Sequence, residues 1–143
     1  MTKPGGWIEL VEIAVTTGNS GPNLTKSNSW IKEAMMQRGI NLDYPIEPGL
    51  KFLMEEANVI NIQEGNLHLP LYQEGGEVAK LLREDAKMFD TSIGPMISRT
   101  LGIPLEEFKQ VREAAFVEMD EYKSYYRCFR AWGQKKKASV SLD

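Results

Sequence analysis

The chain contains one cysteine and one histidine among its 143 residues. A single cysteine, Cys128, excludes a disulfide within the chain, so we expect a reducing, cytoplasmic environment. No group of His, Cys and Asp residues has the spacing of metal ligands, which excludes a structural zinc site. The sequence therefore predicts a fold held together by packing rather than by covalent or metal cross-links.

The chain also lacks a basic surplus and long apolar runs. Its net charge is −3 and its pI is about 5.3, which argues against a nucleic acid as partner. No apolar run approaches the roughly 20 residues of a membrane span, and Lys3-Pro4-Gly5-Gly6 would interrupt the core of a signal peptide. The 42% hydrophobic content suffices for one domain, which we assign to residues 1–137, with 138–143 as a flexible tail.

Hydrophobic periodicity predicts strands at residues 7–15, 59–71 and 122–134. The first is apolar on both faces, as in the middle of a covered sheet, and Gly65 marks a bulge in the second. Residues 16–29 read as a loop rich in glycine and polar residues. We expect a first helix that starts at Ser27 or Asn28 and ends at Gly39, and a short second helix from Leu50. A third helix should open at Gly75-Gly76 and be kinked or broken at Gly94-Pro95. A fourth should begin at Pro104.

Five motifs occur in an informative order. The first is the Lys3-Pro4-Gly5-Gly6 turn, which runs directly into the strand Trp7-Ile8-Glu9. This turn and the four motifs that follow it, taken in order, resemble the C-terminal half of fungal S-adenosylmethionine-dependent class I methyltransferases of secondary metabolism. The matching pieces are Lys3 to Glu9, Leu50 to Val59, Leu67 to Leu71, Leu101 to Val117 and Tyr125 to Gly133.

The resemblance implies an α/β fragment with about three strands, equivalent to strands 5, 6 and 7 of the family, and about four to five helices. The family's cofactor half carries a glycine-rich loop after its first strand and an acidic residue after its second, and this sequence matches neither. We therefore expect no cofactor to bind the chain alone. The strand at 7–15 would have an open edge, which implies a homodimer or a complementing N-terminal half as partner.

The candidate catalytic residues are Glu9, Glu12 and His68. The resemblance places the two glutamates where a methyltransferase sheet faces its active site, and a histidine can act as general acid or base. Solvent-facing carboxylates and a hydrogen-bonded surface histidine are the alternatives. Candidate substrate-binding residues are Trp30, Met35, Tyr72, Met88, Met96 and Tyr126, which could line an adaptable apolar pocket or fill the core.

Three functions remain open from the sequence. The chain could be the substrate-side half of a methyltransferase, incompetent alone, acting on a small apolar molecule such as a polyketide or terpenoid. It could be a cofactor-independent cyclase or isomerase, resembling pericyclases, with an apolar pocket formed by a homodimer. It could also be an inactive regulatory or truncated remnant.

Overall fold

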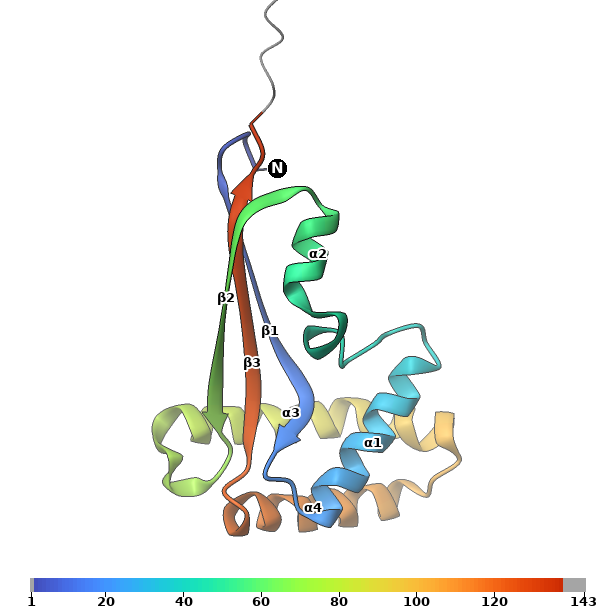
Figure 1. Cartoon of the computed structure of the whole chain (residues 1–143). Helices are drawn as coiled ribbons and strands as arrows, with labels where there is room; N and C mark the ends of the chain where they lie inside the picture. The colour runs from blue at the N-terminus through green and yellow to red at the C-terminus, as the bar shows by residue number, and fades with distance from the viewer. Residues whose placement is uncertain (1, 138–143) are drawn as a thin grey trace, which may run out of the picture.

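A computed structural model describes residues 2–137 (Figure 1). Within them, a three-stranded sheet is accompanied by four α-helices, which confirms the expected fold class. None of the described helices is long and apolar enough to cross a membrane. The elements, in chain order, are β1 (Trp7–Gly18), α1 (Pro22–Met36), the irregular turn η1 (Pro45–Gly49), α2 (Leu50–Glu56), β2 (Val59–Pro70), the short turn η2 (Gln73–Gly75), α3 (Gly76–Leu101), α4 (Leu105–Glu121) and β3 (Tyr125–Lys135).

The strand order is β1-β3-β2, and β3 is antiparallel to both neighbours. Strands β1 and β2 therefore run in the same direction, and their carboxyl ends lie at the same end of the sheet. Among the described residues β1 pairs with β3 alone, so its other edge is free.

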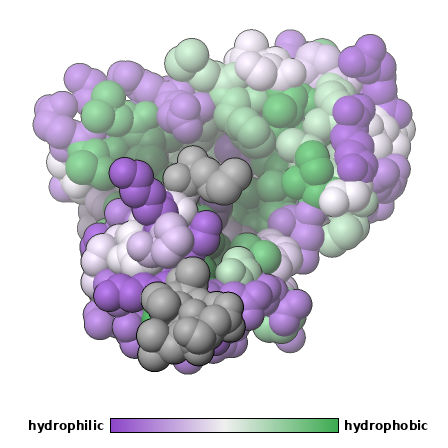
Figure 2. All heavy atoms as spheres, turned by 90° about the horizontal axis from the view of Figure 1, so that it is seen from above, coloured by the Kyte–Doolittle hydropathy of each residue, from purple (hydrophilic) through white to green (hydrophobic). Residues whose placement is uncertain are grey.

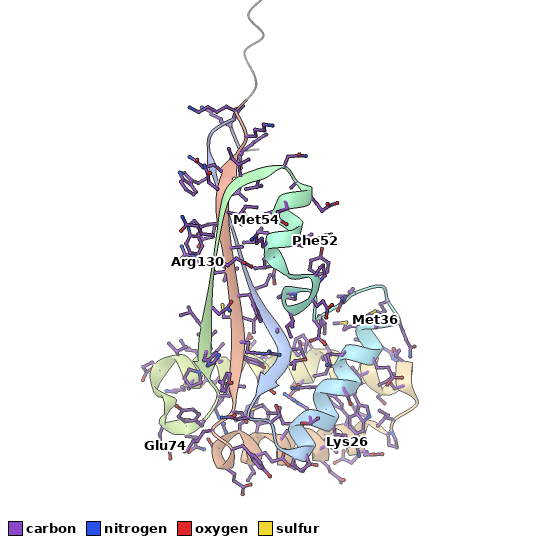
Figure 3. The ribbon with its side chains drawn as sticks, in the orientation of Figure 1. Lys26, Met36, Phe52, Met54, Glu74 and Arg130 are labelled. Carbon is purple, nitrogen blue, oxygen red and sulfur yellow. The ribbon has the colours of Figure 1, made fainter. Side chains whose placement is uncertain are left out.

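Helix α2 covers one face of the sheet. Its Met54 points toward the strands, whereas Arg130 of β3 lies on the opposite side (Figure 3). Met54 is 1% exposed and packs with Leu50, Val59 and Ala131. On the face that carries Arg130, Trp7 and Val11 of β1 are more than half exposed. This face of the sheet is therefore uncovered near the free edge.

Helices α1, α3 and α4 gather around the carboxyl ends of β1 and β2 (Figure 1). Figure 2 looks along the strands onto this helical layer, where apolar side chains are gathered in view. Two buried clusters hold it together. The first cluster contains Leu24, Leu71, Ala115 and Met119. The second contains Ile31, Ala34, Ile97 and Phe108.

The predicted start of the first helix at Ser27 or Asn28 was wrong. Helix α1 begins at Pro22, and both polar residues are buried inside it. Proline is favourable in the first turn because its missing N–H would have no helical partner there. The loop predicted at residues 16–29 is therefore confined to residues 19–21, because residues 16–18 belong to β1 and residues 22–29 to α1.

Two further predictions need correction. Helix α3 continues through Gly94 and Pro95 without a break, and Gly94 is buried because Phe108 of α4 packs closely against it. In β2 the register shifts between Ile60 and Gln63 rather than at Gly65. The intervening Asn61 has a φ of 55°, a left-handed conformation that asparagine tolerates. The tail assigned to 138–143 lies outside the described residues.

Candidate functional site

A cavity of about 370 Å³ lies beside β1, between this strand, the loop after α1 and α2. Its size falls in the range of small-molecule sites. Its walls are mostly apolar, and Glu12 is the acidic side chain among them. The apolar walls come from Leu10, Ile13, Ile40, Leu42, Leu50 and Leu53. The cavity therefore combines an apolar surface with one carboxylate that can bind an amine or accept a proton.

The loop that forms one wall of this cavity is fixed by Asp43. The hydroxyl of Thr16 donates to Asp43 Oδ1 at 2.7 Å, and Lys32 Nζ donates to Oδ2 at 3.0 Å. Partial burial would raise the pKa of Asp43, but these hydrogen bonds and the charges of Lys32 and Arg127 outweigh it and lower the pKa. Asp43 is therefore held as a carboxylate that joins β1, α1 and the loop.

Glu9 and Glu12 do not meet. Glu12 faces the side of the sheet that α2 covers and lines the cavity, whereas Glu9 pairs with Arg130 on the opposite face. The Arg130 guanidinium in turn lies 4.7 Å from the centre of the Trp132 ring. The two glutamates therefore cannot act on one substrate as an acid and base pair.

His68 lies on β2, with β3 between it and β1. It is exposed, and its ring stacks on Tyr125 with centroids 4.1 Å apart and planes 22° apart. Its position is compatible with a surface role, and its catalytic role stays a prediction.

The six candidate substrate-binding residues are spread over several sites. Trp30 and Met96 pack against the cluster around Phe108, and Tyr126 packs against the cluster around Leu24. Met88 is 70% exposed on α3. Of the other two, Met35 is half-buried on α1, and Tyr72 lies beneath Lys123 Nζ, 5.0 Å from its ring centre. No described cavity unites them, and their roles stay predictions.

Two turns of the chain join a strand to a helix through glycines, the arrangement that could cradle a nucleotide. In the turn from β1 to α1, the Glu118 carboxylate already occupies the helix N-terminus. It accepts hydrogen bonds from the backbone N–H groups of Asn23 at 3.0 Å and Leu24 at 2.8 Å. A Cβ on Gly21 would lie 2.5 Å from this carboxylate. An anionic cofactor does not fit a site whose donors and space are taken by another anion.

The turn from β2 to α3 does not fit a nucleotide either. A Cβ on Gly75 would lie 2.7 Å from the Pro70 side chain and 2.8 Å from that of Ala79. This glycine therefore permits close packing of the strand end against the helix rather than an approach of a ligand. Among the described residues, neither turn is therefore open to the phosphate group of a nucleotide.

The sequence analysis assigned Gly21 and Pro22 to a loop, although proline at the first helical position is a recognisable helix start. It could not find Glu118, because nothing local indicates that a carboxylate 94 residues after Leu24 would close that turn. Asp43 and Lys32 were overlooked for the same reason.

No family model matches the chain. The chain is similar to the N-methyltransferase verN of Clonostachys rogersoniana, with 28% identity over 137 residues. The match covers 93% of this chain and 46% of the relative, so the chain spans about half the length of the curated relative it matches. The protein is methyltransferase-like in sequence.

Proposed function

We propose that this chain is the substrate-side half of a methyltransferase-like enzyme of secondary metabolism, and that a complementing half holds the cofactor. The observation that carries the proposal is the sheet order β1-β3-β2, which agrees with the terminal strands of the family and ends in a free edge. The similarity to an N-methyltransferase supports a nitrogen atom of a small apolar molecule as the methyl acceptor.

The cavity beside β1 is the proposed substrate site. Its apolar walls suit a polyketide- or terpenoid-derived skeleton. Glu12 lies on β1, the strand whose outer edge is free. Glu12 is assigned the role of orienting the acceptor amine and taking up its proton. Asp43, Thr16 and Lys32 keep the cavity wall in place and do not contact the substrate in this proposal.

The complementing half is proposed to pair with the free edge of β1. An unpaired edge exposes backbone N–H and C=O groups that a further strand can satisfy. Trp7 is 58% exposed, Val11 54% and Ile13 41%, so apolar surface flanks the edge and would be buried on pairing. More than half of the relative has no counterpart in this chain, which is enough to supply such a partner.

The test is a calorimetric titration with S-adenosylmethionine. One sample is this chain alone, and the other is a chimera in which the unmatched part of the relative precedes Lys3 of this chain. We expect binding to the chimera and none to the chain alone. Circular dichroism establishes that both samples are folded. Stoichiometric binding to the chain alone, or none to a folded chimera, would contradict the proposal.

The role of Glu12 is tested in the same chimera by methylation of a panel of apolar amines. Glu12→Gln removes the base and should lower kcat by about 10²-fold or more. Glu55→Gln is the matched control, because Glu55 is an exposed carboxylate on α2 outside the cavity. Equal kcat values for the two variants would remove Glu12 from the mechanism.

A second candidate is the cofactor-independent cyclase or isomerase formed by a homodimer. The closure of the β1–α1 turn by Glu118 favours it, because this turn is filled without any nucleotide. Its test is conversion of a polyketide or terpenoid precursor by the chain alone without added cofactor. Equal conversion by boiled protein would exclude it, and inactivity of both chain and chimera would favour the remnant.

A further inference from the structure

The end of the sheet that lies away from α1, α3 and α4 carries a cluster of lysines. The turn that leads into β1 and the end of β3 both lie at this end (Figure 1). Lys3 is the first residue of that turn, Lys135 is the last residue of β3, and Lys136 and Lys137 follow it. We refer to these four residues as the lysine tip.

Backbone and side-chain contacts bring the two segments of the lysine tip together. The N–H of Gly5 donates to the carbonyl of Lys135 at 2.8 Å, and the N–H of Lys135 donates to the carbonyl of Gly6 at 2.9 Å. Lys135 Nζ donates to the backbone carbonyl of Thr2 at 3.0 Å. The side chain of Lys137 lies against Gly5, since a Cβ added there would be 3.2 Å from Lys137 Cε. The lysines therefore form one cluster.

The lysine tip has no compensating anion among the described residues. None of its four lysines forms an ion pair there, whereas five other lysines do. Lys3, Lys136 and Lys137 are exposed. The whole chain has a net charge of −3, so the residues outside the lysine tip sum to −7. The charge is therefore divided unevenly, and the positive end of the sheet is complementary to an anionic surface.

Two exposed apolar side chains lie beside the lysine tip on the uncovered face of the sheet. Gln134 of β3 is in register with Trp7 of β1 and with Ile60 of β2, and residues in register across antiparallel strands point to the same face. Trp7 is 58% exposed and Ile60 41%. Tryptophan and lysine together are typical of membrane–water interfaces. Lysines alone would fit any polyanion, but the neighbouring apolar side chains favour a lipid surface over a nucleic acid.

We propose that the lysine tip binds the surface of an anionic phospholipid bilayer, where its ammonium groups pair with lipid headgroups while Trp7 and Ile60 enter the interface. Helices α1, α3 and α4, at the other end of the strands, would then face away from the membrane. The proposal does not rest on the proposed function. Because a complementing half on the free edge of β1 would cover Trp7, the tests use the dilute chain alone.

The first test is co-sedimentation of the chain with large unilamellar vesicles. One set contains phosphatidylcholine alone, and the other also contains about 30% phosphatidylserine. Each lysine near an anionic surface strengthens binding about fivefold, so we expect at least about tenfold tighter binding to the anionic vesicles. Most of this difference should disappear at about 0.5 M salt, because salt screens the charges. Affinities within twofold for the two sets, or no binding up to millimolar lipid, would overturn the proposal.

A pair of double variants tests the location. Lys136→Glu with Lys137→Glu reverses two charges of the lysine tip, and Lys80→Glu with Lys87→Glu makes the same change in net charge on α3, where both lysines are exposed. We expect at least about tenfold weaker binding of the first variant to anionic vesicles and less than about threefold for the second. Equal losses in two folded variants would contradict the assignment, and the wild-type comparison of vesicles stands if either variant fails to fold.

The fluorescence of Trp7 tests the contact with lipid rather than with another polyanion. The other two tryptophans, Trp30 and Trp132, are half-buried in the folded chain. We expect the emission to shift to shorter wavelength on anionic vesicles, and Trp7→Phe should abolish this shift. A shift that persists in Trp7→Phe would place the contact elsewhere and overturn the proposal. Tighter binding to duplex DNA than to anionic vesicles, at the same salt concentration, would assign the lysine tip to nucleic acid instead.

Discussion

A Cβ atom added to Gly21 would lie 2.5 Å from Oε2 of Glu118. The carboxylate is close because it accepts hydrogen bonds from the first turn of α1, including one from the Asn23 side chain at 2.7 Å. Glu118 is 7% exposed, so α4 holds the turn after β1 from a buried position. This contact fixes where α1 begins and closes the turn to other anions.

Gly21→Ala should therefore destabilise the protein. The new methyl group would displace the Glu118 carboxylate and weaken the cap of α1, and we expect a loss of about 1–3 kcal/mol in the free energy of unfolding. Urea denaturation followed by circular dichroism measures it. The control is Gly65→Ala, since a Cβ at Gly65 would be 3.6 Å from the nearest atom of Trp132, an ordinary contact. Equal effects of the two substitutions would show that the Glu118 contact is not responsible.

The same carboxylate predicts a pH dependence. Burial would raise the pKa of Glu118, but hydrogen bonds from Asn23 and Leu24 outweigh it and hold the pKa below its ordinary value of 4.5. A group whose pKa is lowered on folding stabilises the native state above its unfolded pKa, and this contribution disappears as the pH falls through the folded pKa.

Glu118→Gln removes this ionisable group. The wild type should be more stable than the variant by about 1–3 kcal/mol above pH 5, with the difference shrinking on acidification below about pH 4.5. Denaturation curves from pH 3 to pH 7 provide the measurement. A difference independent of pH would mean that Glu118 does not titrate as described.

Replacing Arg112 by methionine should be among the most destabilising single changes on the helical layer. Arg112 Nε donates to Asp90 Oδ2 at 2.7 Å, and the two side chains are only 6% and 11% exposed. The substitution leaves the Asp90 carboxylate buried without this partner, which costs about 3–5 kcal/mol. Lys26→Met is the comparison, because Lys26 and Glu107 form an ion pair with both side chains about half exposed and such pairs contribute about 0–1 kcal/mol. Chemical denaturation measures the loss in the free energy of unfolding for each variant. A loss for Arg112→Met as small as that for Lys26→Met would contradict the burial of the pair.

Without its complementing half, the chain should pair with itself along β1. Val11→Lys places a charge on the open face of this edge strand and should shift the protein toward monomer. Val117→Lys is matched in exposure, at 58% against 54%, but lies on α4 and should leave association unchanged. Light scattering at increasing protein concentration measures the molar mass of the wild type and of each variant. A wild type that stays monomeric at all concentrations would refute self-pairing.

The strands were predictable because their signals are local. An apolar run after the Lys3-Pro4-Gly5-Gly6 turn located β1. Its apolar residues on both faces wrongly indicated a covered strand in the middle of the sheet, whereas β1 is an edge strand that leaves Trp7 and Val11 exposed. The start of α1 was missed because its cap comes from Glu118, which is distant in sequence. Gly94-Pro95 predicts a kink or break, but α3 is not broken there, and Gly94 packs against Phe108 of α4.

The candidate site was predictable only in part. Glu12 lies on the cavity beside β1, but its alternation with Glu9 already implied that the two face opposite ways. The buried ion pair of Arg112 with Asp90 depends on how α3, α4 and α1 pack, and no sequence pattern indicates it. Residues that act through long-range contacts were therefore the ones overlooked.

Hydrogen exchange at β1 tests most directly whether the chain is one half of a larger sheet. The amides of β1 that face away from β3 should exchange at least about tenfold more slowly in the chimera than in the dilute chain alone, because a further strand would then accept their hydrogen bonds. Unchanged exchange of these amides in a folded chimera that binds S-adenosylmethionine would contradict the account.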